Sequence, residues 1–128
     1  MAASGWGTKE SPRLVTGVGL SLQDTVVQPD LVVVCDPTKL DDRGVRGAPD
    51  WIVEVLSPAT ASHDQIITLA AYERSGVPEV WLVHPSDRVV SVYRLDNAMY
   101  GRANIRELEG TLTVASIPGL TIDWEQFN

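Results

Sequence analysis

The sequence predicts a mixed α/β fold, in which one sheet contains a hairpin, a strand-helix-strand crossover and further antiparallel strands. Two observations predict it. Apolar, β-branched runs at 31–35, 51–56 and 80–83 have the length and composition of buried strands. A segment with helix start and stop signals separates the second run from the third, and such a connection places the flanking strands parallel in one sheet.

The first two strands are expected to form an antiparallel hairpin. PDLVVVC, residues 29–35, is a β-branched run that begins after a proline, and DWIVEVLS, residues 50–57, is the next apolar run. The connection DPTKLDDRGVRGAP, residues 36–49, is rich in Asp, Gly and Arg, which is typical of a long solvated tip. A short strand is also possible from Arg13 to Gly19.

A helix is expected to begin at Ser62, because Ser62-His63-Asp64-Gln65 has the form of a capping box. It ends at Ser75-Gly76-Val77-Pro78, since Gly adopts the left-handed cap and Pro blocks continuation. VWLVH, residues 80–84, is then a strand parallel to the one that carries Glu54. RVVSVYRL pairs back on it, and TLTVAS and LTIDW are edge strands joined by the turn IPG.

Length and composition indicate one globular domain over residues 13–128, preceded by a mobile leader at residues 1–12. No apolar run approaches the roughly 20 residues that cross a bilayer, and the N-terminus has no signal-peptide block, so we expect a cytoplasmic protein without membrane contact. The net charge of −7 excludes a broad basic surface for nucleic acid. Contacts with phosphates would therefore be local or metal-assisted.

Glu54 is out of place in an apolar strand, because burying an unpaired carboxylate costs several kcal/mol. Side chains alternate along strands, so Asp30 and Glu54 can face the same side of a hairpin. At about 4 Å their repulsion is roughly 4 kcal/mol at an effective dielectric of 20. A shared proton, a basic neighbour such as Arg43 or Arg46, or a divalent ion would relieve it. The spacing alone leaves the salt bridge and the metal equally open.

The order PDLVVV, PDWIVEVLSP, and Tyr-x-x-x-Gly-Val-Pro-Glu-x-Trp ending at Trp81 resembles the Uma-two family of putative restriction endonucleases, in the PD-(D/E)XK nuclease superfamily. The resemblance runs from about Val26 to the C-terminus. It implies a restriction-endonuclease-like α/β fold and DNA as substrate. It further implies that Asp30 and Glu54 are catalytic and that they bind Mg²⁺ (or Mn²⁺) together with the carbonyl of Val55.

The chain departs from the family pattern at the lysine. Leu56 stands where the superfamily lysine would follow Glu54 by two residues. In the family that this chain resembles, the lysine lies instead on the helix, four residues before the tyrosine, and Thr68 stands at that position here. Loss of such a charged donor typically costs about 3 to 4 kcal/mol of transition-state stabilisation. The alternative function is a catalytically inactive nuclease-fold module for binding or for homodimerisation through exposed sheet edges. The family also extends further upstream than this chain.

Several other residues have competing interpretations. Tyr72 shares a helix face with Asp64 and Thr68 and could border the acidic site, although a core position with a satisfied hydroxyl is favoured. Cys35 is interpreted as a buried apolar residue. Trp51 and Trp81 are expected in the core. Nothing beyond the presence of two carboxylates supports acid/base hydrolysis of the glycosidase kind.

Overall fold

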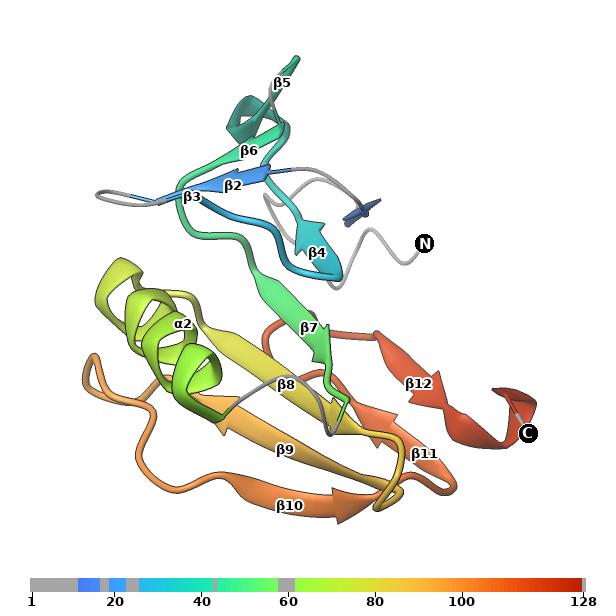
Figure 1. The fold of residues 1–128 in the computed structure, drawn as a ribbon. Helices are drawn as coiled ribbons and strands as arrows, with labels where there is room; N and C mark the ends of the chain where they lie inside the picture. Colours follow the sequence, from blue (N-terminus) through green and yellow to red (C-terminus); the bar gives the residue numbers. More distant parts are fainter. Residues whose placement is uncertain (1–11, 17–18, 23–25, 43, 58–61, 128) are drawn as a thin grey trace.

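The structure is a computed structural model that describes residues 12–16, 19–22, 26–42, 44–57 and 62–127. Its largest element is a six-stranded mixed sheet, in which only β7 and β8 pair in parallel (Figure 1). In spatial order the strands are β1 (Arg13–Val15), β4 (Leu31–Val34), β7 (Trp51–Val55), β8 (Glu79–His84), β9 (Val89–Arg94) and β10 (Asn104–Glu107).

The expected hairpin and crossover are confirmed. Strand β4 pairs antiparallel with β7, with Leu31 opposite Val53, and β7 pairs in parallel with β8. The connection between β7 and β8 contains α2 (Ser62–Ser75), the expected helix. The side chains of residues 62–65, which include the expected capping box, lie outside the described part of the chain.

Helix α2 ends as its sequence predicts. Gly76 has a φ of 81°, a conformation that glycine adopts without the steric cost of a side chain. The N–H of Gly76 donates to the carbonyl of Glu73, and the N–H of Val77 donates to the carbonyl of Tyr72. This pair of bonds is a Schellman motif, which satisfies the last carbonyls of the helix. It turns the chain directly into β8.

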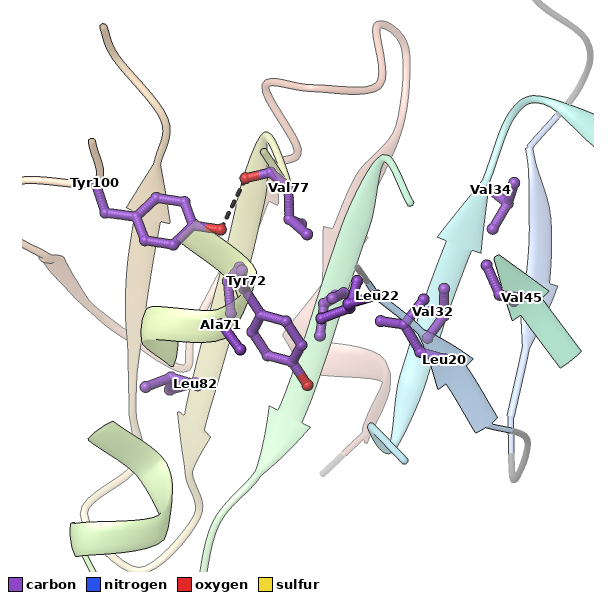
Figure 2. Close-up of a cluster of buried hydrophobic side chains, with 12 residues drawn as sticks. Leu20, Leu22, Val32, Val34, Val45, Ala71, Tyr72, Val77, Leu82 and Tyr100 are labelled. Atoms are coloured by element: carbon purple, nitrogen blue, oxygen red, sulfur yellow. Dashed lines mark hydrogen bonds between the residues drawn. The ribbon is translucent and has the colours of Figure 1, made fainter. Parts of the chain in front are cut away.

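The two faces of the sheet bury separate apolar clusters, because side chains alternate along each strand. The first cluster lies against α2 and includes Val32, Ile52, Leu82 and Tyr72. Figure 2 shows the Tyr72 ring among the aliphatic side chains of this cluster. The second cluster, on the other face, includes Cys35, Trp51 and Trp81, all three buried as expected.

A short hairpin covers the second cluster. Strands β11 (Thr111–Thr113) and β12 (Thr121–Asp123) pair antiparallel, and the segment between them contributes Val114 and Ile117. The expected terminal strands are therefore present, but they pair with each other in a separate two-stranded sheet. A 3₁₀ helix, η2 (Trp124–Phe127), follows them. Strand β10, which extends the edge of the main sheet, was not anticipated, because NIRE is exposed throughout and shows no apolar alternation.

The expectation of a solvated tip between the first two strands is wrong. Residues 36–49 instead contain a 3₁₀ helix and two strands of a second sheet, at the top of Figure 1. Val45 is buried in this sheet beside Leu20, and a Cβ at Gly44 would collide with the Gly19 carbonyl. The elements are β2 (Gly19–Ser21), β3 (Val26–Val27), η1 (Pro37–Lys39), β5 (Leu40–Asp41) and β6 (Gly44–Arg46).

The sequence could not show this pairing because β2 and β6 pair in parallel across more than twenty residues of chain. The possible strand from Arg13 to Gly19 is likewise split. Its first part is β1, and its last residue begins β2. The expected leader falls largely on residues 1–11, outside the described residues. In the described part of the chain, no helix is both long and apolar enough to cross a membrane.

Candidate metal site at the β4–β7 strand ends

Asp30 and Glu54 meet at one end of the β4–β7 ladder. Leu31 pairs with Val53, so Asp30 stands opposite Glu54 one step further along the same register. The Asp30 N–H donates to Glu54 Oε1 at 3.3 Å. The Val55 N–H donates to Asp30 Oδ2 at 2.7 Å. The expected approach of the two acids on one face is therefore observed, and Val55 lies beside them.

Glu54 is less buried than its apolar neighbours suggested. Trp51, Ile52 and Val53 are buried, whereas Glu54 is half-buried and Val55 is 52% exposed. The strand thus emerges from the core at the point where the carboxylate appears. A solvent-facing strand end is a place that a substrate can reach.

Tyr72 joins this pair from α2. Its side chain is 1% exposed, yet its hydroxyl donates to Glu54 Oε2 at 2.7 Å. Burial and the neighbouring Glu54 charge raise the pKa of Tyr72 well above its ordinary value, so the hydroxyl stays protonated and can donate. The favoured interpretation of Tyr72 as a core residue is correct, and the competing one is also correct, because its polar end reaches the acids.

The electrostatics of Glu54 reflect this crowding. Burial raises the pKa of the Glu54 carboxyl most, and the Asp30 charge raises it further. The hydrogen bonds from the Tyr72 hydroxyl and the Asp30 N–H lower the pKa and compensate in part. The ionised pair is therefore under repulsion that two neutral donors only partly relieve.

The salt bridge considered for Arg46 is not formed with Glu54. Arg46 Nε lies 2.6 Å from Asp41 Oδ2, in the small sheet. Arg43, the other arginine considered, lies outside the described residues. In the part of the chain that the structure describes, the hydrogen-bond partners recorded for the Glu54 carboxylate are Tyr72 and the Asp30 N–H.

The chain is similar to known proteins in sequence and in fold. The model of the family described as "Uma2: Putative restriction endonuclease" matches residues 7–125. The chain belongs to the Uma2 family. One similar solved structure is the crystal structure of a putative nuclease belonging to DUF820 from Anabaena variabilis ATCC 29413, at a TM-score of 0.69 and 20% identity. The alignment covers 89% of this chain and 66% of that one, so this chain spans just under two thirds of that length. No curated protein matches.

The Uma2 assignment and the solved structure agree with the restriction-endonuclease-like fold inferred from the sequence. Thr68, which the sequence resemblance sets at the position of a family lysine, lies on α2 one helical turn before Tyr72 and is half-buried. Asp64, which shares this helix face, has a side chain outside the described set.

The oxygen atoms at this strand end of the Uma2 chain are of the kind that binds a divalent ion. Among the described residues, no group of three or more His, Cys, Asp and Glu side chains could hold a metal. Asp30 and Glu54 supply two carboxylates, and the exposed Val55 supplies a backbone carbonyl at the same strand end. Mg²⁺ is typically bound by oxygen ligands, of which one or two are carboxylates and several are waters. The residues fit such an ion, although side chains alone do not complete its shell.

The sequence patterns did not indicate a third acid, Glu79, as a structural residue. Glu79 is fully buried, and its carboxylate accepts from Trp81 Nε1 at 2.7 Å and from the Ser116 N–H at 2.8 Å. Arg94 Nε lies 3.5 Å from the same group. The available signal was an acid adjoining a run of apolar strand residues, as at Glu54. Glu79 ties the segment between β11 and β12 to the sheet, away from the Asp30–Glu54 pair.

Proposed function

We propose that this protein is a divalent-metal-dependent endonuclease that hydrolyses phosphodiester bonds in DNA. The observation that carries the proposal is the meeting of Asp30, Glu54 and Val55 at one solvent-facing strand end. Membership of the Uma2 family and the nuclease-like fold support it. The two carboxylates and the Val55 carbonyl would hold Mg²⁺ or Mn²⁺.

The ion would polarise a phosphate oxygen and lower the pKa of a water molecule beside it. The protein contributes the positions of the ligands. Asp30 is held by the Val55 N–H, and Glu54 is held by the Tyr72 hydroxyl, which is itself fixed in the core. Such partners orient metal ligands and are as important to a site as the ligands themselves.

A metal also suits the charge of the molecule. With a net charge of −7, the protein repels a polyanion, and phosphate contact needs a local positive charge. A divalent ion at the two carboxylates supplies it. The cytoplasmic location and the homodimer expected from the sequence stay predictions and would be compatible with this role.

The test is nicking of supercoiled plasmid DNA by the purified full chain, with Mg²⁺, with Mn²⁺ and with EDTA. We expect cleavage that requires the ion and that Asp30→Asn and Glu54→Gln each abolish. Asp87→Asn, which makes the same change in the exposed β8–β9 turn, serves as the matched control and should cleave like the wild type. Cleavage that persists in EDTA, or in both site variants, would contradict the proposal.

A second candidate is a metal-binding module of the nuclease fold that does not cleave. The uncharged Thr68 at the position of the family lysine favours it, because a charged donor contributes a hundredfold or more in rate at such sites, about 3 to 4 kcal/mol. A wild type that binds Mn²⁺, binds DNA and fails to nick it would support this candidate over the enzyme.

A further inference from the structure

Both acids at the proposed site already accept hydrogen bonds from the protein. Glu54 Oε2 accepts the short bond from the Tyr72 hydroxyl, at 2.7 Å, and Oε1 accepts a longer bond from the Asp30 N–H, at 3.3 Å. Asp30 Oδ2 accepts from the Val55 N–H at 2.7 Å. Each carboxylate therefore has one oxygen held by a strong donor, and the other oxygen is the better placed to bind an ion.

The Tyr72 donor is rigid. Its ring is 1% exposed and packs in the cluster with Ala71, Val77 and Leu82. Figure 2 shows the ring surrounded by apolar side chains, with the hydroxyl at its far end. A buried aromatic side chain cannot follow a carboxylate that rotates, so rotation of the Glu54 carboxylate toward an ion would break this hydrogen bond.

This constraint acts differently on different ions. Ca²⁺ takes six to eight oxygen ligands in flexible geometry and often uses both oxygens of one carboxylate. Mg²⁺ demands a compact octahedral shell and is commonly bound by one or two carboxylates and several waters. A site that offers single oxygens from two fixed carboxylates suits the smaller ion.

We propose that Tyr72 is a positioning residue that makes the Asp30–Glu54 site select Mg²⁺ or Mn²⁺ over Ca²⁺. It does so by fixing the orientation of the Glu54 carboxylate, so that this group is not free to turn toward a larger ion and chelate it with both oxygens. The inference rests on the proposed metal site and adds to it the residue that determines which ion is bound.

The experiment measures dissociation constants rather than cleavage. Mg²⁺, Mn²⁺ and Ca²⁺ are each titrated calorimetrically into the metal-free full chain and into Tyr72→Phe, which removes only the hydroxyl. Loss of a partner that orients a metal ligand typically weakens binding by about 10-fold or more. We expect Tyr72→Phe to weaken Mg²⁺ and Mn²⁺ binding while Ca²⁺ binding is unchanged or stronger, so that the selectivity ratio falls by about 10-fold.

Tyr100→Phe is the matched control. Tyr100 belongs to the same buried cluster, but its hydroxyl donates to the Val77 carbonyl at 2.8 Å, as Figure 2 shows. Removal of this hydroxyl should lower the melting temperature in EDTA and leave the ratio of dissociation constants unchanged. The control separates a loss of stability from a loss of selectivity.

The outcomes are distinct. A wild-type preference for Mg²⁺ over Ca²⁺ that Tyr72→Phe reduces and Tyr100→Phe retains supports the proposal. An unchanged ratio in Tyr72→Phe overturns it and leaves the proposed function intact, whereas a wild type that binds no divalent ion overturns both. A wild type that binds Ca²⁺ as tightly as Mg²⁺ overturns the selectivity proposal even if Tyr72→Phe has no cooperative melt.

Discussion

Asp30 stands opposite Glu54 one step beyond the last pair of the β4–β7 ladder, and the Asp30 N–H donates to Glu54 Oε1 at 3.3 Å. The backbone of one acid thus binds the side chain of the other. This bond brings two like charges together, and the Asp30 charge raises the pKa of Glu54. Removal of either charge should therefore relieve repulsion in the metal-free protein.

Glu54→Gln should remove stabilisation by metal without destabilising the metal-free protein. In EDTA the variant is expected within about 1 kcal/mol of the wild type, because it loses a repulsive charge and retains a carbonyl that accepts from Tyr72. With Mn²⁺ at 100 times its Kd, the wild type should gain about 2.7 kcal/mol and the variant nothing. Thermal melts in EDTA and in Mn²⁺ measure both quantities.

The control for that comparison is Glu73→Gln, the same substitution at a glutamate outside the site. The Glu73 carboxylate accepts a hydrogen bond from the Tyr100 N–H at 2.8 Å. This variant should keep the gain with Mn²⁺. If Glu54 were instead part of a buried salt bridge, Glu54→Gln would cost about 3 to 5 kcal/mol in EDTA as well as in metal. That result would show Glu54 to be structural.

The contribution of Glu54 to the stability of the metal-free protein should fall as the pH rises from acid toward neutral. The folded state raises the pKa of Glu54 above its ordinary value of 4.5, chiefly by burial, so it binds the proton more tightly than the unfolded chain does. The Glu54 contribution is therefore complete below pH 4.5 and is lost as the pH rises through the folded-state pKa. Urea midpoints of the wild type and Glu54→Gln in EDTA across this range measure the difference. A difference that stays constant, or that moves in favour of the wild type with rising pH, would refute the prediction.

Thr68→Lys should increase metal-dependent nicking of plasmid DNA. It places a positive donor on α2 one turn before Tyr72, at the position that the sequence resemblance assigns to a lysine, and such a donor is worth about a hundredfold in rate. Nicking rates in Mg²⁺ test it. Ile67→Lys is the control, because Ile67 precedes Thr68 and is 55% exposed. Equal gains in both variants would indicate a general effect of charge on DNA binding.

Glu79→Ala should destabilise the fold by about 3 kcal/mol, because it leaves the buried Trp81 Nε1 and the Ser116 N–H without their acceptor. Urea unfolding of the two proteins gives the difference. Glu125→Ala removes an exposed carboxylate that accepts the Gly110 N–H and should cost no more than about 0.5 kcal/mol. If the two variants are equally stable, Glu79 does not anchor the β11–β12 segment as the structure indicates.

Part of the site could be predicted from the sequence because it depends on local patterns. The proline-led strand before Cys35 and the strand around Glu54 follow from β-branched runs, and alternation places Asp30 and Glu54 on one face. Gly76 predicts the end of α2, and its Schellman bonds join residues three and five apart. These features need only the conformation of neighbouring residues, which short sequences encode.

The sequence by itself therefore determined the order of the main elements, the β4–β7 hairpin, the parallel β7–β8 pair and the two acids. The tertiary structure alone decided that Tyr72 holds Glu54 across 18 residues, that Glu79 receives the Ser116 N–H across 37, and that Val45 closes a second sheet against Leu20. The physical reason is that these contacts depend on how distant faces pack. Residue type and periodicity specify that a side chain is buried or polar, but only the packed arrangement specifies its partner.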